Sequence, residues 1–207
     1  MFASREDAGQ KLGSHLKSLG VEADVVLGLP RGGLVVAAEV ARVLRTPLDV
    51  LIVRKIGHPF HREFAVGALA EKGVVVLDER MAQDHPAVRA ELEKVVREET
   101  QRLHSYEARF HKTGSPQIAN RRVLLVDDGL ATGATTQAAA LSVRNQGASR
   151  VIVSAPVASQ NAVERLTNLA DETIVLCVDP DFEAVGRYYD IFPQTTDAEV
   201  LELLKVA

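Results

Sequence analysis

Two adjacent carboxylates, Asp127 and Asp128, stand between an apolar run at residues 123–126 and a loop of small residues at 129–135. The apolar run has the length and composition of a buried parallel strand, and an alanine-rich helical pattern follows the loop. The first turn of a helix has unpaired amide groups and lies at the positive end of the helix dipole. A strand, a turn of small residues and a helix N-terminus therefore make a cradle for an anion such as phosphate, and two threonines in the loop add hydroxyl donors.

The acid pair needs a different partner, because carboxylates repel phosphate. Sugar hydroxyls, or a hydrated divalent cation that bridges to the ligand, are suitable groups. A phosphate cradle beside a grip for a diol or for Mg²⁺ suggests a ribose 5-phosphate as ligand. A Walker A nucleotide site is excluded, because no Gly-Lys-Ser or Gly-Lys-Thr ends the loop.

The stretch VLLVDDGLATGAT closely resembles the phosphoribosyl pyrophosphate (PRPP) motif of the type I phosphoribosyltransferases. The resemblance implies that Asp127 and Asp128 act in catalysis by holding the ribose 2′- and 3′-hydroxyls, and that they bind Mg²⁺ directly or through ribose or water. It also implies five positions that hold the 5′-phosphate, which are Ala131, Thr132, Gly133, Ala134 and Thr135. An ordinary strand–turn–helix with solvated acids is the alternative, and it is disfavoured because thirteen consecutive positions fit the pattern.

A second strand–loop–helix unit has its strand at residues 24–28, its helix at 34–44 and a glycine-rich turn between them. The turn lacks the G-x-G of dinucleotide-binding sites. Beside the PRPP motif it resembles the pyrophosphate-binding loop of the same family, and a plain structural turn is the alternative. The residues that this resemblance implies in pyrophosphate binding are Pro30, Arg31, Gly32 and Gly33.

A third strand is expected at residues 48–53, and it ends in two cations, Arg54 and Lys55. Because α/β folds collect ligands at the carboxyl ends of strands, the resemblance implies a further pyrophosphate contact here, with solvated charges as the alternative. Residues 56–63 contain Gly, Pro and two histidines, and read as a mobile loop that resembles the family's flexible loop closing over PRPP. Metal binding by its two histidines is disfavoured, because no third ligand stands nearby.

The remaining elements fit a single α/β domain. We expect a β-hairpin formed by residues 64–70 and 74–78, a long amphipathic helix at 86–110, strands at 150–155 and 173–178, and a helix at 160–170. This alternation predicts a doubly wound parallel sheet flanked by helices, with the ligand loops at one edge. The domain comprises residues 1–207, with a core at about 20–178, the long helix as an insertion and a small C-terminal hood at about 179–207. His104 and His111, on or just past the long helix, are expected to be solvated.

An aromatic cluster lies in residues 179–190, after the last expected strand. It resembles the C-terminal hood of the purine-type phosphoribosyltransferases, in which an aromatic side chain stacks on the base. The resemblance makes Phe182 and Tyr188 the acceptor-binding candidates. A small hydrophobic cap on the core is the equal alternative, because an aromatic cluster alone does not show a ligand.

Composition narrows the function classes. A net charge of −4 argues against a nucleic-acid or anionic membrane surface. Cys177 is the only cysteine, which excludes an internal disulfide and fits a reducing cytoplasm. Its apolar surroundings predict a buried structural thiol. We find no signal peptide and no membrane-spanning run, so a cytoplasmic location is expected.

The resemblance implies transfer of ribose 5-phosphate from PRPP to a nitrogenous base, purine-like by the hood, with Mg²⁺ as cofactor and pyrophosphate as product. Ala131 leaves the acceptor open, because hypoxanthine-type members have a carboxylate at the matching place, whereas members acting on adenine or xanthine have Ala. The expected partners are PRPP and a small-molecule base, without nucleic acid or membrane, and the long helix leaves a homodimer open. The alternative is a non-catalytic PRPP- or nucleotide-binding regulator of the same fold. A phosphate-ester hydrolase is disfavoured, because the sequence shows no nucleophile or further metal ligand for it.

Overall fold

The computed structural model describes residues 1–78, 86–111 and 114–205. Its core is a five-stranded parallel sheet with the strand order β2-β1-β6-β7-β8. The strands are β1 (Val25–Gly28), β2 (Leu48–Val50), β6 (Arg122–Val126), β7 (Arg150–Ser159) and β8 (Glu172–Asp179). The strand order changes direction between β1 and β6, which is where open α/β sheets form a ligand crevice.

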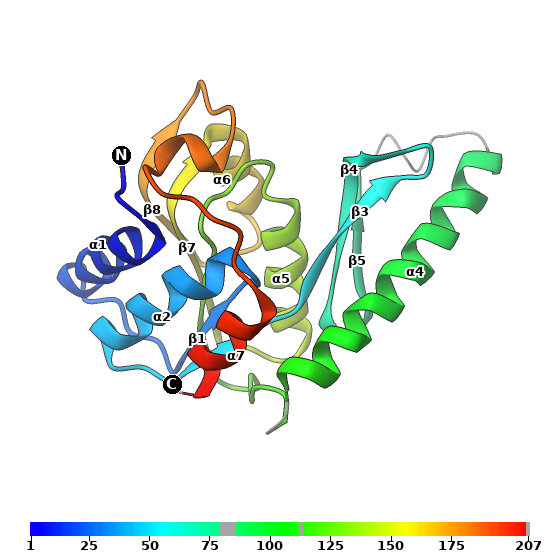
Figure 1. Ribbon diagram of the computed structural model, residues 1–207. Coiled ribbons are helices and arrows are strands. Elements are labelled where there is room, and N and C mark those ends of the chain that lie inside the picture. The colour runs from blue at the N-terminus through cyan, green and yellow to red at the C-terminus, as the bar shows by residue number, and fades with distance from the viewer. Residues whose placement is uncertain (79–85, 112–113, 206–207) are drawn as a thin grey trace.

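Helices cover both faces of this sheet (Figure 1). They are α1 (Arg5–Ser18) and α2 (Gly32–Leu44) on one face, and α5 (Ala134–Asn145) and α6 (Gln160–Leu166) on the other. In β6, Val123 and Leu125 pack toward α5, whereas Leu124 and Val126 pack toward α1 and α2. Burial on both faces explains why β6 reads as a continuous apolar run, and the predicted doubly wound sheet is confirmed.

The N-terminal helix α1 is capped by a serine at its start and is followed by a glycine that ends it. The Ser4 hydroxyl accepts the amide of Asp7 at 3.4 Å, and Gly20 just past the helix has a left-handed φ of 70°. Other boundaries shift by a few residues. The strand β7 continues to Ser159 because it stays paired with β8 as far as Asp179, and the helix α6 ends at Leu166 instead of residue 170.

A second, antiparallel sheet of three strands and the long helix form an arm at one side of the core (Figure 1). The strands are β3 (Val53–His58), β4 (His61–Ala70) and β5 (Val74–Leu77), with the 3₁₀ turn η1 (Glu71–Gly73) before β5, and the helix is α4 (Pro86–Phe110). The hairpin of β4 and β5 and the long helix are confirmed. Leu92, Val95 and Leu103 of α4 are buried in one cluster with residues of β3 and β4.

Two expectations about this region are wrong. The predicted strand 48–53 is two strands, because the chain leaves the parallel sheet after Val50 and Val53 pairs with Ala70 of β4. The stretch 56–63, predicted as a loop, is the turn end of the β-hairpin of β3 and β4, in which His58 pairs with His61; its mobility stays a prediction. Glycine and proline in this stretch indicate irregular pairing, a bulge at Gly57 and a tight turn at Pro59, rather than a loop without strands.

The C-terminal hood contains the 3₁₀ turn η2 (Val185–Tyr188) and the helix α7 (Asp197–Lys205). It is joined to the N-terminal segment, because Phe2 donates its amide to the Tyr188 carbonyl at 2.8 Å and Asp190 donates its amide to the Phe2 carbonyl at 2.9 Å. Cys177 is exposed, contrary to the prediction of a buried thiol. It lies in β8, the edge strand of the sheet, where one side of the strand has no neighbour in the sheet.

The side chain of His111 is buried at the base of the arm, contrary to the prediction that it is solvated. Its Nε2 lies 2.8 Å from Glu71 Oε1, and their side chains are only 5% and 1% exposed. The Glu71 carboxylate also accepts a hydrogen bond from the amide of Ile52 at 2.6 Å, and the Glu71 backbone carbonyl accepts one from the Ser142 hydroxyl at 2.7 Å. The contact therefore joins the end of α4 to η1, the start of β3 and helix α5.

The pKa of His111 is raised. Burial by itself lowers it, but the hydrogen bond and charge of Glu71 and the charges of Asp49 and Glu107 outweigh that effect. A raised pKa in the folded state means that protonation stabilises the fold. This contribution is fully present below the unfolded value of 6.5 and is lost as the pH rises through the folded value.

We expect His111→Gln to lower the free energy of unfolding by about 1.5–3 kcal/mol at about pH 5.5, and by much less at about pH 9. Urea unfolding of both proteins at the two pH values measures this difference. His104→Gln, an exposed position on the same helix, is the control. An equal loss at both pH values would show that His111 stabilises the arm by packing alone.

Candidate active site

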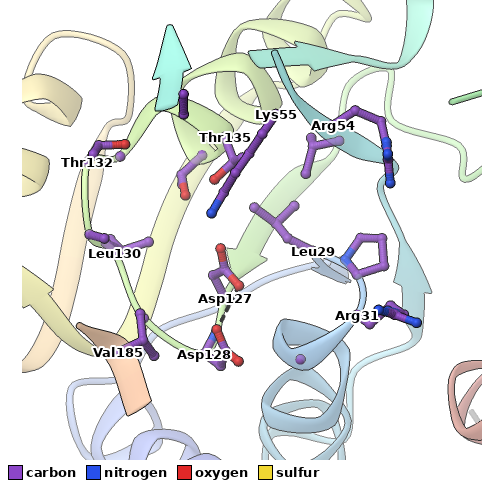
Figure 2. A pocket seen from close by; sticks show the side chains of 18 of the residues that line it. Leu29, Arg31, Arg54, Lys55, Asp127, Asp128, Leu130, Thr132, Thr135 and Val185 are labelled. Carbon is purple, nitrogen blue, oxygen red and sulfur yellow. Dashed lines mark hydrogen bonds between the residues drawn. The ribbon is translucent and has the colours of Figure 1, made fainter. Parts of the chain in front are cut away.

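A cavity of about 950 Å³ opens at the carboxyl ends of β1 and β6 and extends to the arm. Most of the residues expected to bind ligand line it, namely Pro30, Arg31, Gly32, Arg54, Lys55, Asp127, Asp128, Ala131, Thr132, Gly133 and Thr135. Figure 2 shows that the acid pair, the threonines and the cations approach this space from different elements. The parallel sheet brings the turn after β1 and the acid pair together, since β1 and β6 are neighbours and end at the same edge.

The acid pair is half-buried at the end of β6, where Asp128 donates its amide to Asp127 Oδ1 at 2.9 Å (Figure 2). Burial and the charge of Asp128 raise the pKa of Asp127 well above its ordinary value, while the charge of Lys55 opposes this rise. Lys55 reaches from β3 toward Asp127 in Figure 2. The site therefore holds negative charge that is costly without a cation.

Glycines in the turn after β1 allow close approach to the acid pair. A Cβ added at Gly33 would lie 2.6 Å from Asp127 Oδ1, and one at Gly32 would collide with Asp128 Oδ2. Gly33 does not line the cavity itself, so its place is explained by packing against the acids. The peptide bond between Pro30 and Arg31 is cis. The glycine-rich turn and the acid pair thus form one compact edge of the cavity.

Arg5 contacts the acid pair from the first turn of α1. Its Nε donates to Asp128 Oδ2 at 2.7 Å, and the residue is only 8% exposed. Sequence reasoning missed this residue, because nothing in the pattern of an ordinary capped helix indicates a contact with an acid 123 positions further along the chain.

The small-residue loop after the acid pair is held from behind by β7. Leu130 donates its amide to the Val157 carbonyl at 2.9 Å, and the Ser159 hydroxyl donates to the Ala131 carbonyl at 2.6 Å. Gly133 has a left-handed φ of 73° as it leads into α5, a conformation that favours glycine. The amides at the start of α5 are therefore fixed before any ligand arrives.

Thr136 is a further cradle residue that the sequence reasoning did not select. It lines the cavity and is 1% exposed, and in the described structure its hydroxyl oxygen has no hydrogen-bond partner. A buried hydroxyl without a partner is costly and is available to a ligand. Ala134, the remaining predicted position, contributes the first residue of α5 but does not line the cavity.

If the cradle binds phosphate, removing one hydroxyl should weaken it. We expect Thr135→Val to reduce the affinity for inorganic phosphate about two- to tenfold, the effect of one lost hydrogen bond. Titration followed by amide chemical shifts measures it. Thr167→Val, at an exposed position just past α6, is the control and should bind as the parent does. An unchanged affinity in Thr135→Val would remove this hydroxyl from the cradle.

The arm supplies the cationic wall of the cavity. Arg54 and Lys55 lie within β3 rather than at the end of a parallel strand, because the chain has already left the core sheet. They still line the cavity, since β3 passes alongside its opening. Glu99 of α4 accepts from Arg54 at 2.9 Å and from Arg102 at 2.6 Å, and is 6% exposed.

Helix α4 is therefore part of the site as well as of the packing. Glu98, Glu99 and Arg102 line the cavity, and Glu98 lies 3.1 Å from Arg62 of β4. Arg31 of the turn after β1 lines the same cavity, and its Nη1 lies 3.6 Å from Asp197 Oδ1 of α7. The helix period alone could not reveal which face of α4 would meet a ligand.

We expect Glu99→Gln to weaken the binding of inorganic pyrophosphate about three- to tenfold, because Arg54 loses the charged partner that holds it at the cavity. Calorimetry measures the affinity. Glu91→Gln, an exposed acid of α4 that pairs with Lys94, is the matched control. Equal or tighter binding by Glu99→Gln would show that Arg54 is positioned without this contact.

The two acceptor-binding candidates stack on each other. The rings of Phe182 and Tyr188 lie 5.3 Å apart at 21°, and the Tyr188 hydroxyl donates to Asp179 at 2.6 Å. Neither lines the cavity, whereas Val185 of the same hood does. Their role in binding a base stays a prediction.

Other candidate features are outside the site. His58 and His61 stack with ring centroids 5.7 Å apart on the hairpin. Across residues 1–78, 86–111 and 114–205, no three His, Cys, Asp or Glu side chains gather as a metal cage. Over the same residues, we find no helix with both the length and the apolar character needed to cross a bilayer.

The parallel sheet, the acid pair and the small-residue loop define a type I phosphoribosyltransferase-like fold. The family described as phosphoribosyl transferase domain matches residues 4–189, and the chain belongs to this family. It is 42% identical over 206 residues to "Putative phosphoribosyl transferase Rv0571c" of Mycobacterium tuberculosis (strain ATCC 25618 / H37Rv), covering 99% of this chain and 46% of that protein. The chain spans about half the length of the curated relatives it matches.

Solved structures agree with this assignment. TT1426 from Thermus thermophilus is 44% identical with a TM-score of 0.82, and the match covers 99% of this chain and 97% of that one. A purine phosphoribosyltransferase from Pyrococcus horikoshii Ot3 shares the fold at 15% identity and a TM-score of 0.50, over 93% and 92% of the two chains. The APRTase of Giardia lamblia, complexed with 9-deazaadenine, does so at 15% identity and a TM-score of 0.50, over 84% of this chain and 79% of that one.

Proposed function

We propose that this chain transfers ribose 5-phosphate from PRPP to a nitrogen of a purine-like base and releases pyrophosphate. The observation that carries the proposal is one cavity bounded by three different groups, which are the acid pair, the fixed amides before α5 and the cations of the turn after β1 and of β3. PRPP combines a sugar diol, a phosphate and a pyrophosphate, and each matches one of these groups.

The charges of the cavity suit the reaction. Breaking the bond between ribose C1 and pyrophosphate builds positive charge on the ring and negative charge on the leaving group. Asp127 and Asp128 would hold the hydroxyls and stabilise the cationic ring, whereas Arg31, Arg54 and Lys55 would stabilise the departing anion. The start of α5 would keep the 5′-phosphate in place while the ring moves.

The residues present fit a hydrated Mg²⁺ that is held largely by the ligand. The two carboxylates of the acid pair line the cavity beside the proposed phosphate sites, and one or two carboxylates together with substrate phosphates are the usual ligands of Mg²⁺. Asp127 and Asp128 would hold the ion directly or through ribose or water. When bound, the ion would supply further neutralisation of the pyrophosphate.

The proposal includes a small-molecule acceptor and a cytoplasmic location. The formal charge of −4 is unfavourable for nucleic acid or anionic lipid, and one cysteine allows no internal disulfide. Because the curated relatives are about twice as long, the proposed activity is that of this domain.

The test is pyrophosphate release from Mg-PRPP with a panel of purine and pyrimidine bases. We expect release with at least one purine-type base. Asp127→Asn and Asp128→Asn should weaken Mg-PRPP binding about 10- to 100-fold, because each charge-assisted bond contributes about 1.5–3 kcal/mol. Turnover should fall further than binding, since the ring is cationic only in the transition state.

Asp181→Asn, an exposed acid of the hood, is the control for both measurements. If both acid-pair variants bind Mg-PRPP as the parent does, the acid pair does not hold the ribose. If the parent binds Mg-PRPP tightly but no base gives pyrophosphate, the chain is a PRPP-binding regulator. Two observations would fit a regulator. Ala131 cannot transfer a proton, and the rings of Phe182 and Tyr188 are engaged with each other.

A further inference from the structure

We propose that Arg5 is a positioning residue for the candidate active site, which orients Asp128 and couples it to the C-terminal hood. The inference rests on the proposed function for its meaning in catalysis, but its geometry is independent of that function. Arg5 does not line the ligand cavity, so it would act through Asp128 rather than on a substrate.

One guanidinium makes three contacts to two parts of the molecule. Nε donates to Asp128 Oδ2 at 2.7 Å, Nη1 donates to the Pro193 carbonyl at 2.6 Å, and the group lies 3.7 Å from the centroid of the Phe192 ring. Arg5 is 8% exposed, so water does not compete strongly for these contacts. A planar fork can satisfy all three at once, which a lysine ammonium on a flexible stem cannot.

Backbone contacts keep Arg5 in this place. The Ser4 cap and the pairing of Phe2 with the hood fix the start of α1, and Ile191 donates its amide to the Ala3 carbonyl at 3.1 Å. On the other side, the Tyr189 hydroxyl donates to the Asp128 carbonyl at 2.6 Å. Backbone and side chain of Asp128 are therefore both held by elements outside the PRPP motif.

The turn after β1 leaves room for this arrangement. A Cβ at Gly32 would lie 2.7 Å from Arg5 Nε. Gly32 therefore has two neighbours to accommodate, the acid and its cation. This explains a glycine at this position from packing, in addition to any contact with pyrophosphate.

The contact between Arg5 and Asp128 reduces the negative charge of the site. Two adjacent carboxylates beside a phosphate cradle would repel a polyanionic ligand. Arg5 offsets the charge of Asp128, and Lys55 lies opposite Asp127. Arg5 takes one of the acceptor sites of the Asp128 carboxylate, and the remaining lone pairs can still accept a sugar hydroxyl. A shift of Phe192 or Pro193 in the hood would move Arg5 and with it the carboxylate.

The decisive experiment is a double-mutant cycle on Mg-PRPP affinity, measured by calorimetry with Arg5→Gln, Asp128→Asn and the double variant. We expect Arg5→Gln to weaken binding about tenfold in the parent and less than about twofold in the Asp128→Asn background, because its effect passes through that carboxylate. Arg5→Lys should recover part of the affinity. Equal losses in both backgrounds would overturn the proposal and leave Arg5 with a structural role only.

A second measurement does not depend on PRPP. Hydrogen exchange of the ligand-free protein should become faster at hood residues 188–192 in Arg5→Gln, whereas Arg122→Gln should leave them unchanged. Arg122 is a matched control, since it pairs with Asp24 and Glu22 at the opposite end of β6. If the parent fails to bind Mg-PRPP, the proposed function is wrong, and the exchange result still decides on Arg5. Unchanged exchange in Arg5→Gln would overturn the coupling.

Discussion

Repulsion between two neighbouring carboxylates is the constraint around which the site is arranged. Asp127 and Asp128 follow each other at the end of a buried strand, where burial and mutual charge raise the pKa of Asp127. Their cations come from distant parts of the chain, Arg5 from the first helix and Lys55 from the arm. The strand, the N-terminal helix and the arm must all be in place before this charge is offset.

In the arm, too, charged side chains are held by partners from other elements. Arg54 would be a solvated charge on an isolated hairpin, but Glu99 of α4 holds it at the cavity with a distance of 2.8 Å between Nη2 and Oε2. Glu99 is buried and pairs with two arginines, and such a carboxylate is stable only when its partners stay close. His111 and Glu71 then connect the far end of α4 to the core. A long helix that looks like simple packing thus carries part of the ligand-facing charge.

The hood differs from the other parts, because its aromatic rings contact each other and the N-terminus instead of the cavity. Phe2, Tyr189 and Phe192 form one chain of ring contacts, with centroids 5.5 Å and 4.9 Å apart. The hood can therefore cap the core and border the ligand cavity at the same time. Val185 borders the cavity while the aromatic residues around it fasten the hood to α1.

The sequence alone determined the features that depend on local order. The run at 123–126, the acid pair and the small-residue loop are contiguous, so strand, turn and helix N-terminus follow from short-range rules, as does α4 with its apolar period. Only the tertiary structure decided what depends on pairing between distant segments. Residues 56–58 and 61–63 form strands because β4 pairs with β3, Cys177 is exposed in the edge strand β8, and the His111 side chain is buried against Glu71. Arg5 meets Asp128 because the folded N-terminus pairs with the hood, a contact across 123 positions that no local pattern encodes.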